Sequence, residues 1–253
     1  MHRFIRGVAQ RLFWGHVRAD IRDNERLVAL LEELLEPGSD CLDVGAHEGA
    51  VLREMVRLAP DGRHIAWEPL PLFAHRLRDQ FPSVVVRDAA LSDRAGKRAF
   101  AHVLDEPGWS GFVARPTPAR SAVEMITVRC ERLDDALPDG VRPAFIKIDV
   151  EGAEEQVLMG ASDTIRRHRP WVAFEHGAGS ADHYGTTPDR IHDLFTEEFG
   201  YRIFGLDWEG PYAANRFKEI FSSGERVNFV AHPTDLPPST SRRVRGGPRP
   251  GGS

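Results

Sequence analysis

The pattern of apolar and polar residues divides the chain into segments that look alternately like helices and strands. Residues 25–36 carry apolar side chains at helical spacing, namely Leu27, Leu30, Leu31, Leu34 and Leu35. Asn24 precedes this stretch and is expected to cap the helix, and Pro37-Gly38 end it. The pattern therefore predicts an amphipathic helix with one buried face.

Short apolar runs and helical patterns then alternate along the chain. Strands are predicted within residues 40–44, 63–69, 83–93, 122–131, 142–149 and 169–176, and helices follow several of them, as at 50–59, 71–81 and 154–161. Strands that alternate with helices favour βαβ units, so the fold class is α/β, a doubly wound and mostly parallel sheet with helices on both faces. In such a sheet, ligands bind beyond the carboxyl ends of the strands.

Composition narrows the picture without changing it. The chain has 253 residues, 41% of them hydrophobic, which suits one α/β domain with additions. Its formal charge of −5 gives no reason to expect a nucleic-acid partner. Cys41 and Cys130 lie in apolar segments without C-x-x-C spacing, so we expect reduced core residues of a cytoplasmic protein.

The two ends of the chain are basic. Residues 1–18 contain four arginines and no acid, with apolar residues at helical spacing. The apolar run is too short for stable membrane insertion, so we expect a helix that packs on the domain, with binding to a membrane surface as the alternative. The last seventeen residues are mostly Pro, Gly, Ser and Arg, and such a composition predicts a disordered tail.

The segment "DVGAHEG" marks the first candidate site. Asp43 ends a predicted strand, Gly45 permits a sharp turn, and Gly49 lets a helix approach closely. Small residues such as Ala46 leave room for a ligand against backbone N–H groups. The segment is not the dinucleotide motif G-x-G-x-x-G, because His47 stands where the middle glycine would be. A purely structural turn is the alternative interpretation.

Two further acids end the next two predicted strands. Glu68 follows Asp43 by 25 residues and is placed to accept hydrogen bonds from both hydroxyls of a ribose. Asp88 ends the third strand, from which a carboxylate could reach an adenine amine. Either residue alone could be an ordinary cap or turn residue. The three acids together, at regular βα spacing, predict a ligand that contains adenosine.

The segment "AFIKIDVEGAEEQVLMGA", residues 144–161, places four acids after a buried strand. Asp149, Glu151, Glu154 and Glu155 could be cap and first-turn residues that complement a helix dipole. They could also lie at a catalytic site, because unpaired carboxylates are costly at the end of a buried strand. Lys147 alternates with two isoleucines and is expected to neutralise one of the acids.

These segments, in order, resemble the FkbM family of S-adenosylmethionine-dependent methyltransferases. The similarity covers "LDVGAHEG", "WEPLP", "RDAALSD", "ERLDD" and "FIKIDVEGAEEQVLMGA", and runs from about Cys41 to about Pro233. The element K-I-D-x-E-G-x-E is its specific part. Together with the patterns at the two ends of the chain, the resemblance predicts three parts: a helical extension at 1–36, a Rossmann-like methyltransferase domain at 37–236 and a disordered basic tail at 237–253.

The resemblance also implies roles for single residues. Asp43, Gly45, Ala46 and Gly49 would surround the methionine part of S-adenosyl-L-methionine, Glu68 would bind its ribose, Asp88 its adenine end, and Asp149 would lie beside the sulfonium and the acceptor. The cationic sulfonium would thus give the acids an electrostatic partner. His47 departs from the family, which usually has asparagine there.

Methyl transfer to an alcohol requires removal of a proton. Asp149, Glu175 and His176 end adjacent predicted strands and are candidate general bases. His176 is the first choice, because an imidazole titrates near neutral pH. A divalent metal held by Asp149 with Glu175 or His176 is an alternative, although the spacing matches no known ligand pattern and no metal site is predicted. The segments 108–112 and 176–185 are expected to form acceptor loops.

The family suggests a hydroxyl on a sugar, a polyketide or a related small molecule or glycan as the acceptor, with nitrogen also open. Two rival functions remain at this point. One is an NAD(P)-dependent oxidoreductase on a similar sheet, and the other is a catalytically silent methyltransferase-like domain that binds partners. The oligomeric state is left open.

Overall fold

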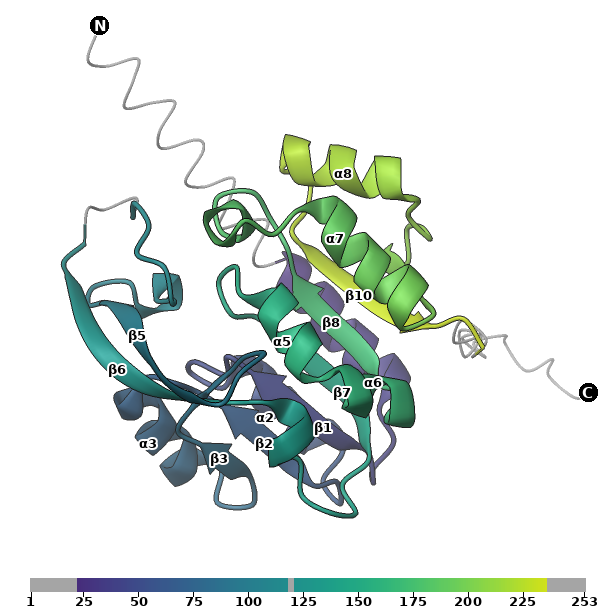
Figure 1. Cartoon of the computed structure of the whole chain (residues 1–253). Coiled ribbons are helices and arrows are strands. Elements are labelled where there is room, and N and C mark those ends of the chain that lie inside the picture. The colour runs from purple at the N-terminus through teal and green to yellow at the C-terminus, as the bar shows by residue number, and fades with distance from the viewer. Residues whose placement is uncertain (1–21, 118–120, 236–253) are drawn as a thin grey trace, which may run out of the picture.

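The computed structural model describes residues 22–117 and 121–235. A seven-stranded sheet lies at its centre, in the order β3-β2-β1-β7-β8-β10-β9 (Figure 1). Its strands are β1 (Asp40–Val44), β2 (His64–Trp67), β3 (Val85–Arg87), β7 (Pro143–Ile148), β8 (Trp171–Glu175), β9 (Tyr201–Gly205) and β10 (Asn228–Pro233). All neighbouring pairs are parallel except those of β10, which is antiparallel to β8 and β9. The predicted doubly wound, mostly parallel sheet is confirmed.

The connections after β1 run to β2 and β3 on one side, and the chain later returns to place β7 on the other side of β1. The carboxyl ends of β1 and β7 therefore form the switch point of the sheet. In open α/β sheets this is where a crevice for a ligand forms.

Helices cover both faces of the sheet. One face packs against α2 (Ala50–Leu58), α3 (Pro71–Gln80) and the helical residues 22–34. The other packs against α5 (Glu154–Gly160), α6 (Ser162–His168), α7 (Pro188–Asp193) and α8 (Ala214–Ser223), several of which lie in front of the sheet in Figure 1. The shorter helical segments are α4 (Leu133–Ala136), η1 (Pro107–Trp109), η2 (Ala181–Tyr184) and the π-helical turn η3 (Leu194–Glu198).

The helix before β1 packs on the domain as its leucine pattern indicates, since Leu27, Leu30 and Leu31 are buried in the same core as Cys41 of β1. The expectation that Asn24 caps this helix is wrong, because the helix already runs at residue 22. Residues 1–21, which form most of the predicted extension, and 236–253, which include the predicted tail, lie outside the described residues.

A second, three-stranded sheet stands beside the first and was not foreseen. Its order is β4-β6-β5, with β4 (Ala90–Leu91), β5 (Gly96–Val103) and β6 (Val123–Glu131). The segment 122–131 is a strand as predicted, but it pairs with β5 and β4 rather than with the main sheet. Phe100 and Val128 pack it against Leu70 and Phe73 at the start of α3. This sheet therefore faces the carboxyl end of β2.

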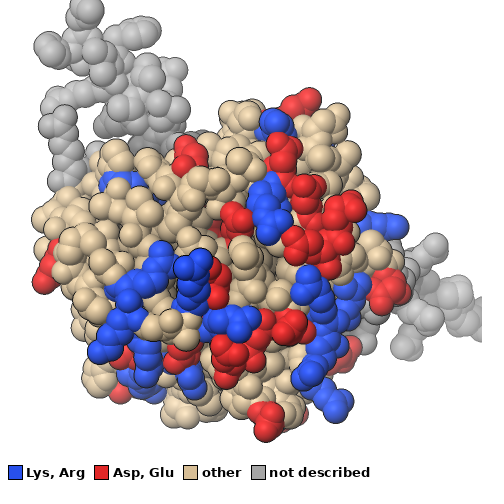
Figure 2. Space-filling view, viewed as in Figure 1, with Lys and Arg blue, Asp and Glu red and all other residues tan. Residues whose placement is uncertain are grey.

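Ion pairs connect neighbouring helices and strands at the charged surface. Figure 2 shows Asp and Glu gathered over α7, whereas Lys and Arg gather over β5, β6 and α6. Arg190 of α7 bridges Glu155 of α5 at 3.0 Å and Glu198 at 2.7 Å.

Both cysteines are buried and form no disulfide bond, as expected. Within the described ranges, every helix is too short or too polar to cross a membrane.

Candidate active site

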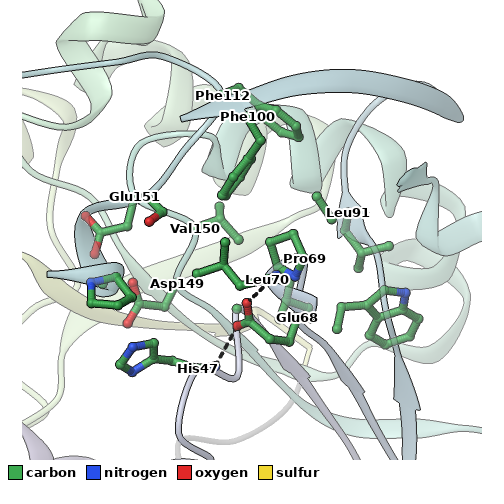
Figure 3. A pocket seen from close by; sticks show the side chains of 17 residues that line it. His47, Glu68, Pro69, Leu70, Leu91, Phe100, Phe112, Asp149, Val150 and Glu151 are labelled. Atoms are coloured by element: carbon green, nitrogen blue, oxygen red, sulfur yellow. Dashed lines mark hydrogen bonds between the residues drawn. The ribbon is translucent and has the colours of Figure 1, made fainter. Parts of the chain in front are cut away.

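A cavity of about 220 Å³ opens at the switch point (Figure 3). Its wall has three parts. The β1 and β2 ends contribute Val44, Gly45, His47, Trp67, Glu68, Pro69 and Leu70; the second sheet and its loop contribute Ala90, Leu91, Phe100, Pro107, Gly108, Ser110 and Phe112; and the β7 loop contributes Asp149, Val150 and Glu151. The predicted glycine turn, the acid after β2 and the acidic motif thus meet at one place.

The glycine turn brings the ends of β1 and β7 into direct contact. Gly45 has φ +82°, and a Cβ atom added there would lie 1.8 Å from the carbonyl oxygen of Asp149. Gly49 has φ +76°, and its Cβ would lie 2.7 Å from the side chains of Leu77 and Phe81. Both conformations disfavour other residues, so the two glycines have the geometry expected of them.

Asp43 lies behind the cavity rather than in its wall. It is 2% exposed, and its neighbour in register on β7 is Lys147. Burial raises the pKa of Asp43 to about 7, with the charge of Lys147 opposing the rise. Its Oδ2 atom has no hydrogen-bond partner among the described residues. The backbone N–H of Leu52 in α2 also opposes the rise, so the carboxyl group lies next to the start of α2 and not in the cavity wall.

Glu68 is fixed by the backbone around it. Its Oε2 accepts a hydrogen bond from the N–H of His47 and its Oε1 from the N–H of Leu70, each at 2.8 Å, as the dashed lines of Figure 3 show. Burial raises its pKa to about 7, while these two N–H groups oppose the rise. His47 has φ +47°, and its ring stacks on Phe73 at 4.5 Å. The turn and the acid after β2 thus form one unit.

The side of the cavity expected to hold an adenine is mainly apolar. Leu70, Leu91, Phe100 and Phe112 line it, and the two phenyl rings meet edge to face at 5.5 Å. Asp88 is half-buried and does not line the cavity, although its charge contributes to the raised pKa of Glu68. Apolar side chains, and not Asp88, therefore form this wall.

Asp149 lies in the cavity wall and is paired with a buried lysine. The Nζ of Lys147 donates a hydrogen bond to its Oδ2 at 3.0 Å. Lys147 is 5% exposed, and burial alone would lower its pKa. The charges of Asp149 and Glu175 outweigh that effect and raise the pKa of Lys147 above its usual value. The expected neutralising lysine is therefore present.

Glu151 is the other acid of the motif in the cavity wall. Its backbone has φ +58°, and its carboxylate pairs with Arg115, whose side chain is almost fully buried. Burial raises the pKa of Glu151 to about 8, and the nearby charge of Asp149 adds to the rise. Sequence reasoning missed Arg115 entirely, because it lies on a separate loop with no recognisable pattern.

The remaining two acids of the motif are structural. Glu154 is 1% exposed, and its Oε1 accepts hydrogen bonds from the N–H groups of Val150 at 3.3 Å and Gly152 at 3.0 Å. Glu155 points away to Arg190 and to the hydroxyl of Thr186, at 3.0 and 2.9 Å. For these two residues the structural interpretation of the motif holds.

Glu175, the last residue of β8, and His176, which follows it, lie on opposite faces of the sheet. Glu175 shares a face with Lys147 and Asp149, and burial together with the charge of Asp149 raises its pKa well above the usual value. It does not line the cavity. Alternation of side chains along the strand sends His176 to the other face.

His176 does not occupy the position expected of a general base. It is fully buried between Phe221 at 4.8 Å and Phe217 at 5.8 Å, away from the cavity wall. Neither ring nitrogen has a hydrogen-bond partner among the described residues, and burial lowers the pKa of His176 to about 4. The geometry therefore does not support the first choice of base.

The two glycine-rich loops lie at the site. Residues 107–112 supply four members of the cavity wall, and Tyr184 of the 176–185 loop contacts this segment from behind. Ala46 is buried beside the glycine turn without lining the cavity. Within residues 22–117 and 121–235, no group of three or more His, Cys, Asp or Glu side chains is arranged to hold a metal ion.

A sheet in this order, with one antiparallel strand and a cavity at the switch point, has the architecture of the class I methyltransferases. Residues 43–203 match the model of the methyltransferase FkbM domain, and the chain belongs to this family. The family places the protein among methyltransferase enzymes and does not favour an oxidoreductase.

Three similar proteins span different shares of the chain. The 2-O-methyltransferase NoeI of Sinorhizobium fredii (strain NBRC 101917 / NGR234) is 29% identical in a 168-residue alignment that covers 60% of this chain and 68% of NoeI. A methyltransferase FkbM from Methylobacillus flagellatus KT is 16% identical, with a TM-score of 0.49, over 79% of this chain and 45% of that protein. A TehB-like methyltransferase from Corynebacterium glutamicum is 13% identical, with a TM-score of 0.46, over 89% and 95%.

Proposed function

We propose that the protein transfers a methyl group from S-adenosyl-L-methionine to a hydroxyl group of a small-molecule or glycan acceptor. The observation that carries the proposal is the cavity at the switch point, in which a fixed Glu68 and a lysine-paired Asp149 both line the wall. Membership of the FkbM family and the name of the NoeI relative support O-methylation.

The residues of the wall fit the cofactor. Each oxygen of Glu68 accepts one backbone N–H and keeps a second lone pair, which suits the two hydroxyls of a ribose. The apolar slot beside Leu91 and Phe112 suits an adenine ring, and the turn at Gly45 leaves room for the methionine part. When bound, S-adenosyl-L-methionine supplies an electrophilic methyl group on a sulfonium. Asp43, Ala46 and Gly49 act in this proposal by shaping the site, whereas Asp88 lies outside the wall and makes no contact with the cofactor.

We assign the proton acceptor to Asp149. Its carboxylate is in the wall, and the Nζ of Lys147 donates a hydrogen bond to it at 3.0 Å. A carboxylate there takes the proton of the acceptor hydroxyl, and general-base catalysis of this kind contributes about 10²–10⁴-fold. Glu175 lies on the same face and is the second candidate, although it does not line the cavity and burial raises its pKa well above the usual value.

The acceptor class follows from the family and the relative rather than from a side chain in the wall. We infer a hydroxyl on a sugar, a polyketide or a glycan, because NoeI is a 2-O-methyltransferase. We place the reaction in the cytoplasm, where the free thiols of Cys41 and Cys130 stay reduced.

Transfer of a labelled methyl group tests the proposal. The protein is incubated with methyl-labelled S-adenosyl-L-methionine and fractionated extracts of glycans and small molecules, and labelled products are identified by mass spectrometry. We expect an O-methyl ether in at least one fraction, formed about 10²-fold or more slowly by Asp149→Asn. Label on nitrogen or carbon would overturn O-methylation, and the absence of any transfer would favour a silent binding domain.

A further inference from the structure

Three loops meet along one side of the cavity. We name residues 107–115 the strap; it supplies Pro107, Gly108, Ser110 and Phe112 to the cavity wall. The β7 loop, with Asp149 and Glu151, lies beside it, and the loop after β8 lies behind both. In Figure 3, Phe112 lies across the cavity from Glu68 and His47. The strap therefore covers the site proposed for the cofactor.

The start of the strap is anchored to its own sheet. Ala101 and Gly111 exchange two backbone hydrogen bonds, at 2.8 and 3.1 Å. The hydroxyl of Ser110 accepts the N–H of Val103 at 3.0 Å. These contacts belong to β5 and do not connect the strap to the main sheet. Its hold on the rest of the site must come from other residues.

Tyr184 provides that connection. Its hydroxyl oxygen accepts the N–H groups of Phe112 at 2.8 Å and Val113 at 3.3 Å. The ring is wedged between two glycines: a Cβ at Gly111 would lie 2.7 Å from the hydroxyl oxygen, and a Cβ at Gly152 would lie 2.8 Å from Cδ2. Tyr184 itself does not line the cavity. It therefore joins the strap to the β7 loop without touching the ligand space.

Arg115 makes a second connection at the end of the strap. Its guanidinium pairs with Glu151 of the β7 loop and donates to the carbonyl oxygen of Gly179 at 3.0 Å. The same guanidinium lies 4.5 Å from the centre of the Trp109 ring. The Arg115 side chain is 6% exposed and the Glu151 side chain 26%, so salt screens this partly buried pair less than it screens a surface pair. Two separate contacts thus tie the strap across the cavity.

We propose that Tyr184 is a positioning residue which, together with Arg115, holds the strap over the cofactor cavity and so sets how fast the cofactor leaves. The inference rests on the proposed function, because the cavity must first bind S-adenosyl-L-methionine. Loss of the Tyr184 hydroxyl leaves two backbone donors of the strap without their acceptor. One net hydrogen bond changes an opening equilibrium by roughly tenfold.

Two measurements on the full chain test this role. Stopped-flow fluorescence gives the dissociation rates of S-adenosyl-L-methionine and S-adenosyl-L-homocysteine, and hydrogen exchange reports the amides of Phe112 and Val113. In Tyr184→Phe we expect both ligands to dissociate about tenfold faster and the two amides to lose protection. The matched control is Tyr201→Phe on β9. It removes a buried hydroxyl that donates a hydrogen bond to the carbonyl oxygen of Pro170 at 2.9 Å. Its dissociation rates should equal those of the wild type.

Arg115→Met removes the second connection and keeps the proposal testable if Tyr184→Phe is unstable. We expect faster dissociation in that variant as well, and a larger increase in the double variant. Unchanged dissociation rates in both single variants, with ligand still bound, would overturn the inference while leaving the proposed function intact. Failure of the wild type to bind either ligand would overturn the proposed function and the inference with it.

Discussion

The two faces of the central sheet differ sharply at the ends of β7 and β8. On one face, Lys147, Asp149 and Glu175 form a charged cluster beside the cavity. On the other, His176 is enclosed by Phe217 and Phe221 and makes no side-chain hydrogen bond to a described residue. Glu175 and His176, which lie on these two faces, are consecutive in the sequence. The alternation of side chains along a strand therefore separates Glu175, a candidate general base, from His176, a histidine of the core.

The acidic motif after β7 shows the same separation over a shorter distance. Asp149 and Glu151 line the cavity, whereas Glu154 holds the loop and Glu155 pairs with Arg190. All four acids look alike in sequence. What distinguishes them is the part of the molecule that each side chain faces: the cavity for Asp149 and Glu151, the motif's own loop for Glu154, and α7 for Glu155.

The largest effect should come from closing the space where β1 meets β7 on the charged face. Gly45→Ala places a methyl group against the Asp149 carbonyl oxygen and strains a positive φ, so we expect a loss of about 3 kcal/mol or more in unfolding free energy. Gly224→Ala is the control, since Gly224 has φ +64° with nothing within 4 Å, and should cost about 1 kcal/mol. Urea unfolding measures both. Equal losses would show that the contact with β7 is not tight.

The next effect distinguishes the two kinds of acid within the motif. Asp149→Asn should lower turnover by about 10²-fold or more, because the amide cannot take the acceptor proton. Glu155→Gln removes the same charge six residues further on, outside the cavity wall, and should leave turnover within about threefold. Initial rates with labelled S-adenosyl-L-methionine measure both. A similar loss in the two variants would mean that the motif acts through net charge or stability alone.

A smaller effect concerns the apolar face. Because the pKa of His176 falls from an ordinary value near 6.5 to about 4 on folding, the unfolded chain binds more protons between these pH values. The stability from keeping His176 neutral is complete above about pH 6.5 and is lost as the pH falls toward 4. At about pH 5 the loss in unfolding free energy amounts to roughly 2 kcal/mol, and His176→Phe should remove it when urea unfolding at that pH is compared with unfolding at neutral pH.

The same variant tests the assignment of the base. His176→Phe should keep turnover at neutral pH within about threefold, since the ring does not reach the cavity. A fall of about 10²-fold with unchanged stability would restore the histidine as general base.

The sequence predicts the sheet, the glycine turn, Glu68 and the acidic motif, because each depends on local signals such as apolar runs, glycine spacing and acids at strand ends. Alternation at the end of β8 places Glu175 and His176 on opposite faces, so an imidazole that ordinarily titrates near neutral pH is not by itself evidence of a general base. Residues that meet only through tertiary contacts were not predicted. The strand β5 has an irregular burial pattern, so its pairing with β6 and the apolar wall at Phe100 and Phe112 were missed. Arg115 and Tyr184 lie on loops whose roles appear only when those loops meet.

The central claim is that the cavity at the switch point binds S-adenosyl-L-methionine with Glu68 on the ribose. Isothermal titration calorimetry of the wild type and of Glu68→Gln tests it most directly, with Asp88→Asn as the control, since Asp88 lies outside the cavity wall. We expect the wild type to bind the cofactor with a micromolar-range Kd. Glu68→Gln should lose about 2 kcal/mol of binding free energy, and Asp88→Asn should change the Kd by less than about threefold. Unchanged affinity in Glu68→Gln, or a larger loss in Asp88→Asn, would contradict the account.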